Sequence, residues 1–118
     1  MGWEIEVTDQ FNEWYDGLGG RETNAVNAAV DFLVEGGPSL GRPFVDTVDA
    51  SQIANMKELR PKRSNIRILF VFDPRRTAIL LIGGSKTDDW QGWYKRNIPE
   101  AERLYAAYLA ELRKDGIL

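Results

Sequence analysis

The chain has 118 residues, of which 43% are hydrophobic and 28% charged, enough to bury one core, so we expect a single domain over residues 1–118. It contains no cysteine and no histidine, which excludes disulfides, thiolate metal sites and imidazole catalysis. We see no cluster of carboxylates in the sequence, and we expect neither a metal nor a cofactor. The net charge of −3 argues against a general nucleic-acid coat but leaves room for a local basic site.

The charges are sorted along the chain. Residues 1–56 carry ten acidic and two basic side chains, a net charge of −8, whereas residues 57–118 carry eight acidic and thirteen basic ones, a net charge of +5. The positive charge is densest over residues 57–76, in Lys57, Arg60, Lys62, Arg63, Arg67, Arg75 and Arg76. Because this segment also has the pattern of strands, we expect one basic face on an otherwise acidic protein, suited to a polyanion or an acidic partner.

The first part of the chain predicts a strand and two helices. Apolar residues alternate with glutamates over residues 3–7, as in a half-buried strand. Thr8 or Asp9 can cap a helix whose apolar face extends to Leu18, where a pair of glycines ends it. A second helix is expected from about Glu22 to Glu35, again ended by glycines.

The second part predicts three strands and one helix. After a loop over residues 38–52, strands are expected at 56–60, 66–72 and 77–82, the last one ended by Gly83-Gly84. A final helix with an apolar stripe is expected to start near Asn97-Ile98-Pro99. The order β-α-α-β-β-β-α predicts an α+β domain with a small, mainly antiparallel sheet and helices packed on it.

Two arginines are the first candidates for a functional site. If the strands pair through the turn at 61–65, Arg60 and Arg67 approach one another on the face that also carries Glu58. Two like charges held close are unfavourable unless an anion lies between them, which suggests an anion site. The alternative is a solvated sheet face on which Glu58 pairs with one arginine, and the residues alone leave the two readings about equal.

Two further segments could carry function. Lys86 follows the two glycines at a strand end, but without the spacing of a phosphate-binding loop a plain turn is the simpler reading. Residues 90–96 bring three aromatic and two basic side chains together, as in sites that stack bases and hold phosphates. The spacing of Trp90, Trp93 and Tyr94 also fits the buried stripe of a helix. For the two tryptophans we favour this packing role. Tyr94, Lys95 and Arg96 are the better functional candidates, because polar tips usually reach solvent.

Taken together, several strings of this sequence resemble one toxin family. They are Leu40-Gly41-Arg42-Pro43, Met56-Lys57-Glu58-Leu59-Arg60-Pro61, Ile66-Arg67-Ile68-Leu69-Phe70, Phe72-Asp73-Pro74-Arg75-Arg76, Gly83-Gly84-Ser85-Lys86, Trp93-Tyr94 and Ile98-Pro99-Glu100-Ala101. With them the chain resembles the HigB-like, phage-derived branch of the RelE/ParE toxin superfamily over nearly its whole length. The family's RelE-like fold has the element order predicted above.

The resemblance implies the toxin of a type II toxin–antitoxin system, a metal-independent endoribonuclease that cuts mRNA, often on the ribosome. The 2′-hydroxyl of the RNA would attack the adjacent phosphate. Cleavage of the mRNA would then inhibit translation. The implied catalytic residues are Arg60 and Arg67 on the scissile phosphate, then Lys86, Glu58 and Tyr94. The implied RNA-binding residues are Lys57, Lys62, Arg63, Arg75, Arg76, Lys95 and Arg96.

The resemblance also implies partners and a compartment. The partners are a cognate antitoxin of the helix-turn-helix type, mRNA and the ribosome, with operator DNA bound only through the antitoxin and no membrane. The N-terminal residues lack the pattern of a signal peptide, so we expect the cytoplasm.

The sequence departs from the family in two ways. Many relatives have catalytic histidines, whereas this chain has none, and many are basic overall, whereas this chain has a net charge of −3. Two other functions therefore stay open. One is a ParE-like inhibitor of DNA gyrase that acts without catalysis. The other is an inactive module that only regulates transcription together with its antitoxin.

Overall fold

The computed structural model describes residues 2–85 and 88–118 and has the predicted order of elements with one additional strand. The elements are β1 (Glu4–Val7), α1 (Asp9–Asp16), α2 (Gly20–Gly36), a short 3₁₀ helix (Gly37–Ser39), β2 (Val45–Thr47), β3 (Met56–Leu59), β4 (Ile66–Asp73), β5 (Thr77–Ser85) and α3 (Trp90–Lys114). The strands form one sheet in the order β1-β5-β4-β3-β2. Only β1 and β5 pair in parallel; the other neighbours are antiparallel. The prediction of an α+β domain with a mainly antiparallel sheet is confirmed.

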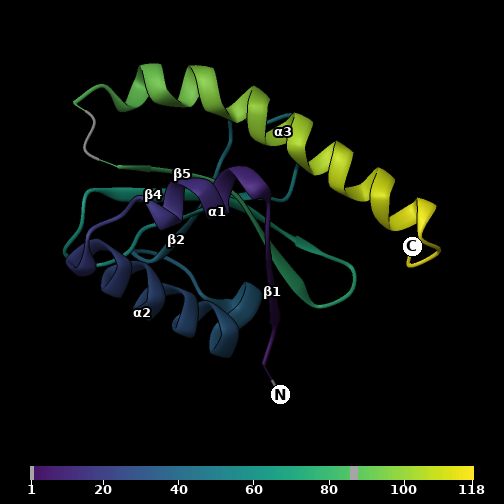
Figure 1. The fold of residues 1–118 in the computed structure, drawn as a ribbon, viewed down its shortest axis with the longest axis horizontal. Coiled ribbons are helices and arrows are strands. Elements are labelled where there is room, and N and C mark those ends of the chain that lie inside the picture. Colours follow the sequence, from purple (N-terminus) through teal and green to yellow (C-terminus); the bar gives the residue numbers. More distant parts are fainter. Residues whose placement is uncertain (1, 86–87) are drawn as a thin grey trace.

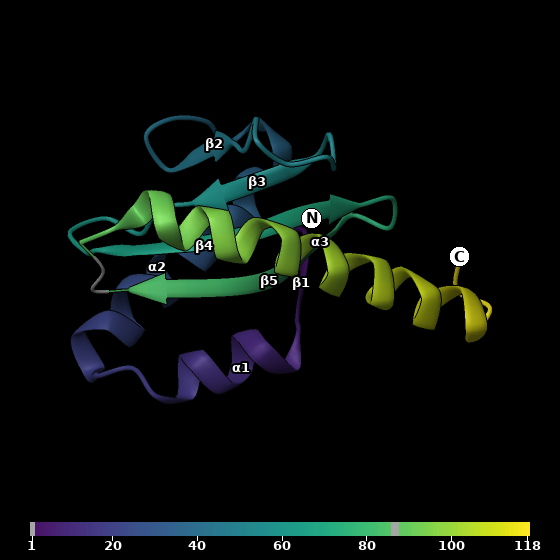
Figure 2. The same cartoon turned by 90° about the horizontal axis from the view of Figure 1, so that it is seen from above.

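The helices lie on different sides of this sheet. Figure 2 shows α3 crossing one face over β4 and β5, with α2 beneath the opposite face. Figure 1 shows the same layers from the side, with the C-terminal part of α3 reaching beyond the sheet. α1 packs against β5, and the Thr8 side chain caps it by accepting a hydrogen bond from the Phe11 N–H at 3.0 Å, as predicted.

Both faces of the central strands are buried. In β4, Ile66, Ile68 and Phe70 belong to the core beneath α1 and α2, whereas Leu69 and Val71 belong to the core beneath α3. The alternation of side chains along β4 gives the protein two apolar cores, one on each face of the sheet. The same alternation places Glu58 and Arg67 on the face that α3 covers.

β5 contains a bulge and continues through its two glycines. Leu69 pairs with Ile82, but the next residue Phe70 pairs with Leu80, so Leu81 is extra and joins Ile82 on the α3 face. The prediction that Gly83-Gly84 ends this strand is wrong, because β5 extends to Ser85.

Tryptophan packing explains the two glycines. A Cβ atom on Gly83 would lie 2.3 Å from the Trp14 ring, and one on Gly84 would lie 2.4 Å from Trp93 Nε1. The two rings come from α1 and α3, so the bare backbone lets both helices approach the same strand closely.

Two other predicted boundaries are wrong. Residues 38–52 do not form a continuous loop, because Val45–Thr47 pairs with β3 as the edge strand β2. The last helix starts at Trp90 rather than near Asn97, with Asp89 capping it by accepting from the Gly92 N–H at 2.9 Å. Pro99 lies inside α3 at an exposed position, and the reading of residues 90–94 as a packed helical stripe is confirmed.

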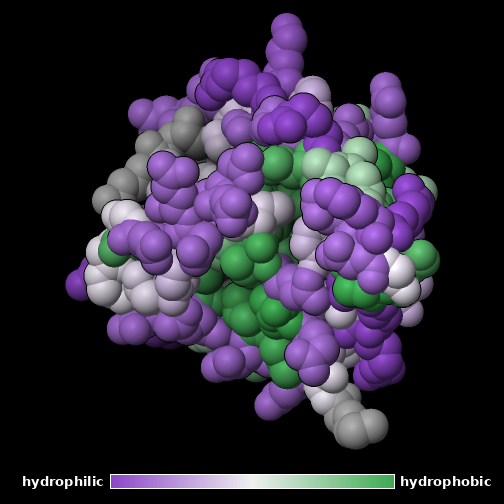
Figure 3. All heavy atoms as spheres, turned by 45° about the vertical axis from the view of Figure 1, so that its right-hand side comes forward, coloured by the Kyte–Doolittle hydropathy of each residue, from purple (hydrophilic) through white to green (hydrophobic). Residues whose placement is uncertain are grey.

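An apolar hollow of about 180 Å³ lies between β1, α1 and α2, where Ile5, Val7, Phe11 and Val30 line it. Val7 is 41% exposed. In Figure 3 apolar side chains reach the surface among hydrophilic ones on the side of the molecule where β1 lies. In the described part of the chain, none of the helices is both long enough and apolar enough to cross a membrane.

The glycine–tryptophan packing can be tested by one methyl group. Gly84→Ala should lower the free energy of unfolding by about 1–3 kcal/mol, because the new Cβ overlaps the Trp93 ring in a filled core. Urea unfolding followed by tryptophan fluorescence measures this. Gly41→Ala is the matched control, since nothing lies within 4 Å of its Cβ position. Equal stability of the two variants would contradict the packing argument.

Candidate functional site

A buried carboxylate, Glu58, lies at the centre of the candidate site. It is only 4% exposed, on the face of β3 beneath the first turns of α3. Tyr94 of α3 lies over it, and the phenol oxygen is 2.8 and 2.7 Å from the two carboxylate oxygens. A buried carboxylate is costly unless it is fully paired, so these contacts fix how α3 sits on the sheet.

Both candidate arginines contact the same carboxylate oxygen. Arg60 Nε donates to Glu58 Oε1 at 2.8 Å, and Arg67 Nε lies 3.6 Å from that atom. Arg67 also donates through Nη1 to the Tyr94 hydroxyl. The predicted approach of the two arginines is confirmed, and Glu58 offsets their mutual repulsion. Of the alternative, the pairing of Glu58 with an arginine is confirmed, whereas the solvated face is wrong, because α3 covers Glu58.

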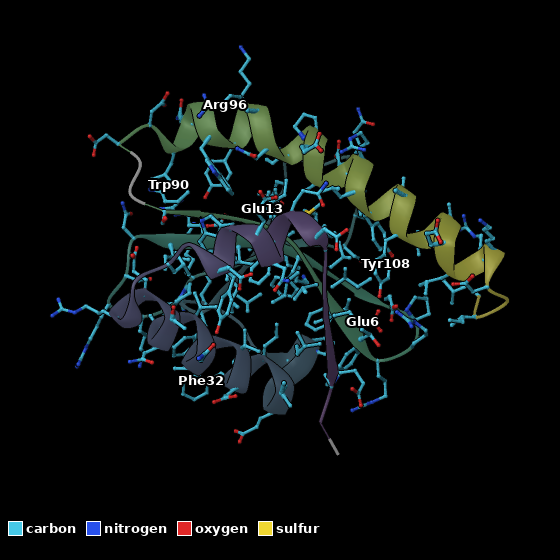
Figure 4. The ribbon with its side chains drawn as sticks, viewed as in Figure 1. Glu6, Glu13, Phe32, Trp90, Arg96 and Tyr108 are labelled. Atoms are coloured by element: carbon cyan, nitrogen blue, oxygen red, sulfur yellow. The ribbon has the colours of Figure 1, made fainter. Side chains whose placement is uncertain are left out.

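Arg67 is held from two further sides. Its guanidinium lies 4.5 Å from the centre of the Trp90 ring and 5.7 Å from that of Tyr94, so it stacks between aromatic side chains. Trp90 is itself positioned by a 3.3 Å hydrogen bond from its Nε1 to Asn65 Oδ1 in the turn before β4. In Figure 4, Trp90 points from α3 towards the sheet. Arg67 therefore has a defined orientation before any ligand binds.

The Glu58 carboxylate shifts the pKa of its partners. Burial of Tyr94 raises the pKa of its phenol, and the hydrogen bond to Glu58 raises it further, so the hydroxyl stays protonated near neutral pH. For Arg60, burial lowers the pKa, but the hydrogen bond and the negative charge of Glu58 outweigh it and the pKa is raised. At neutral pH the site therefore holds two guanidinium cations and one neutral phenol.

The cluster opens to the surface on two sides. Tyr94 borders a hollow of about 430 Å³ between α3 and the loop before β3. Arg60, whose side chain is 43% exposed, borders a hollow of about 310 Å³ with Arg42, Pro43 and Asp46. Arg60 is thus within reach of an anionic ligand, and the Arg67 side chain is 26% exposed, whereas Glu58 itself is buried.

The other predicted basic residues do not form one face. Arg75 and Arg76 lie in the β4–β5 hairpin, at the opposite end of the eight-residue β4 from Arg67. The expectation of a continuous basic face over residues 57–76 is therefore wrong, because an extended strand of this length separates its ends by about 25 Å.

Arg75 is used inside the protein. It pairs with the buried Asp73 at 2.7 Å and with Glu6 at 3.4 Å, and it lies 3.4 Å from the Tyr108 hydroxyl. Figure 4 shows Glu6 and Tyr108 on the same side of the molecule, at the hairpin. Arg76 stacks on Trp3, 4.8 Å from a ring centre. These contacts join the hairpin to β1 and α3.

Three other cations lie on the β3 side. Lys57 points to the face opposite Glu58, with its Nζ 3.4 Å from Thr47 Oγ1. Lys62 lies over the Phe44 ring at 4.8 Å, and Arg63 is exposed in the turn before β4 with a φ of 56°.

The last candidates are on or before α3. Lys95 and Arg96 are exposed, and Figure 4 shows Arg96 on the side of α3 that faces away from the sheet. Lys86 lies outside the described residues. Among the residues that are described, no three acidic side chains come together in a way that could hold a metal ion.

Sequence reasoning missed two residues of the site. Trp90 was read only as a packing residue, yet it stacks on Arg67; Asn65 was read as part of a turn, yet it positions Trp90. The separation of Trp90 and Tyr94 by four residues was the available signal, since it places both rings on one side of a helix.

The fold is that of RelE toxins. The chain matches RelE in the archaeal RelE-RelB complex from Pyrococcus horikoshii OT3 with a TM-score of 0.59 at 13% identity, over 75% of this chain and 99% of that one. It matches the isolated E. coli RelE toxin with a TM-score of 0.59 at 9% identity, over 80% of this chain and 97% of that one. At identities this low, the structural matches establish the fold alone, and the class of protein is a RelE-like α+β domain.

Closer relatives define the family. Residues 13–106 match the family model described as "Phage derived protein Gp49-like". The chain is 48% identical to "Putative toxin HigB3" of Mycobacterium tuberculosis over 112 residues, which cover 95% of this chain and 98% of that protein. It is 45% identical to "Putative toxin HigB2" of the same organism over 94% of this chain but 56% of that protein. The chain belongs to the Gp49-like family and is a toxin of the RelE/HigB type.

The ionisation of Tyr94 gives a pH test of the site. Because the pKa of Tyr94 is higher in the folded protein than in the unfolded chain, the unfolded chain loses the phenolic proton at a lower pH than the folded protein does. The stabilisation is therefore complete below about pH 10, the ordinary tyrosine value, and is lost as the pH rises through the folded pKa. Urea unfolding of the wild type should show a falling free energy of unfolding above that pH, and Tyr94→Phe should show a shallower fall. Parallel curves for the two proteins would mean that the pKa of Tyr94 is not raised in the folded protein.

Proposed function

We propose that this toxin is a metal-independent endoribonuclease that cuts mRNA on the ribosome and is neutralised by a cognate antitoxin. The observation that carries the proposal is the joint contact of Arg60, Arg67 and Tyr94 with one buried carboxylate. It provides two oriented cations and a polar hydroxyl at a surface that RNA can reach.

The two arginines would bind the scissile phosphate. Guanidinium groups match phosphate oxygens with paired N–H donors and keep their charge at all physiological pH values. When the 2′-oxygen attacks phosphorus, negative charge accumulates on the other phosphate oxygens. Arg67 is fixed by Trp90, Tyr94 and Glu58, so its stabilisation of that charge requires little reorganisation.

Tyr94 would carry the proton of the 2′-hydroxyl. Its O–H points at the Glu58 carboxylate, while its oxygen accepts from Arg67 and has one lone pair left for a substrate hydroxyl. The 2′-hydroxyl proton would pass to the Tyr94 oxygen as the phenolic proton moves to Glu58. The bond from phosphorus to the 5′-oxygen then breaks, water protonates that oxygen, and a 2′,3′-cyclic phosphate remains. Glu58 returns its proton to solvent through Tyr94. No histidine is needed in this scheme.

The proposed partners follow from the same site and from the relatives. The P. horikoshii structure is a RelE-RelB complex, and we infer that this toxin also has an antitoxin partner, of the helix-turn-helix type. Such a partner could inhibit by covering Arg60 and Arg67. Operator DNA would be bound only through the antitoxin, and the toxin would act in the cytoplasm, where mRNA is translated.

The nuclease is tested by mapping mRNA 5′ ends after expression of the toxin without any partner. The wild type should produce new ends within translated frames, and Arg67→Ala should reduce their number by at least about a hundredfold, the scale of one lost oxyanion donor. Arg60→Ala should act in the same direction. Glu58 keeps Arg60 and Tyr94 as partners in the Arg67 variant, so the protein should remain folded, which circular dichroism would verify.

Arg21→Ala is the control, because Arg21 is an exposed cation on α2, on the opposite side of the sheet. Unchanged cutting by Arg67→Ala would refute the site. Growth arrest with intact mRNA would refute the nuclease and favour a protein target such as gyrase, and absence of arrest would favour an inactive regulatory module.

A further inference from the structure

The hollow beside Tyr94 is a concave feature that the proposed cleavage chemistry does not use. It measures about 430 Å³, within the range of small-molecule sites. Its walls come from α3 and from the loop that precedes β3. The lining residues are Ala50, Gln52, Gln91, Tyr94, Lys95, Ile98, Pro99 and Glu102.

The loop side of the hollow is fixed to the helix. Glu102 Oε2 accepts from Ser51 Oγ at 2.7 Å and from the Gln52 N–H at 2.6 Å. Ser51 Oγ in turn accepts from the Ile53 N–H at 3.0 Å. One carboxylate of α3 therefore holds three consecutive loop residues, and a ligand would meet a wall that is already formed.

The lining has the chemistry of a nucleotide site. Ile98 and Pro99 offer an apolar wall for the face of a flat ring, and the amides of Gln52 and Gln91 can both donate to and accept from its edge. Lys95 supplies a cation for a phosphate. A simple anion would be repelled by Glu102, and a purely apolar ligand would leave the two amides unpaired.

Tyr94 connects this hollow to the cluster around Glu58. Its ring lines the hollow, while its hydroxyl contacts Glu58 and Arg67. We propose that the hollow binds the RNA base next to the phosphate held by Arg60 and Arg67. This inference rests on the proposed function, and it adds a specificity site that selects where the message is cut.

Glu102 determines which base fits best. Its hydrogen bonds to the loop use Oε2, so Oε1 remains an acceptor for a base. Guanine alone presents two adjacent donors, N1–H and the exocyclic amino group, and both can point at the single free oxygen Oε1. Adenine and cytosine present one donor beside an acceptor, and the one donor of uracil, N3–H, lies between two carbonyl oxygens that Oε1 would repel. The site therefore favours guanine.

Binding is measured apart from cleavage by ¹⁵N NMR titration of the whole toxin with the four nucleoside 5′-monophosphates. GMP should shift the side-chain amide signals of Gln52 and Gln91 at millimolar concentrations, and it should bind more tightly than AMP, CMP or UMP. The double variant Gln52→Ala/Gln91→Ala should weaken GMP binding at least about tenfold, which is about 1.4 kcal/mol. Both glutamines are exposed, so the variant should fold. Arg103→Ala, an exposed α3 variant outside the hollow, should bind GMP normally.

The outcomes separate this inference from the nuclease itself. Messages cut by the wild type should carry guanine beside the cut more often than those cut by the double variant. No GMP binding, equal binding of all four nucleotides, or equal GMP affinity of the double variant would overturn the base site, even if Arg67-dependent cutting is observed. GMP binding in the hollow without any cutting would support the site and refute the nuclease.

Discussion

The burial of Glu58 is the constraint on which the site depends. A carboxylate with 4% exposure must be paired, and its partners come from three elements: Arg60 follows β3, Arg67 belongs to β4 and Tyr94 to α3. The carboxylate also lets two guanidinium groups lie close together without a bound anion. When a phosphate arrives, the arginines would exchange part of their interaction with Glu58 for the ligand. In the proposed mechanism Glu58 would act on RNA only through its neighbours, by orienting the cations and receiving a proton from Tyr94.

The glycines of β5 make this arrangement possible. Trp93 packs on Gly84, and the residue after Trp93 is the one that reaches Glu58. If α3 were raised by the width of a side chain, the phenol could no longer touch both carboxylate oxygens. Trp14 packs on the neighbouring Gly83 from the other layer, so the strand cannot move away from α3 either. The precision of the site therefore comes from core packing on both faces of one strand.

The sequence predicted what local periodicity determines, and it failed where distant contacts decide. The alternation in β4 and the turn at 61–65 were enough to bring Arg60 and Arg67 together. The edge strand β2 has three residues and becomes a strand only through its pairing with β3, which no local pattern encodes. Pro99 indicated a helix start, but Asp89 and the packing of Trp93 extend α3 two turns earlier. The stacking of Trp90 on Arg67 likewise depends on tertiary structure.

Counting charges along the chain overestimates the field available to RNA. Arg60 and Arg67 are neutralised in part by Glu58, and Arg75 by Asp73 and Glu6. Further exposed cations near the site are Lys62 and Arg63 in the turn before β4, and Lys95 and Arg96 on α3. Six of the seven charged side chains of α1 and α2 are acidic, so negative charge lies on one side of the sheet and positive charge on the other. A polyanion would then be oriented towards α3 and the turn before β4, so the net negative charge of the protein does not oppose the RNA binding proposed for the site.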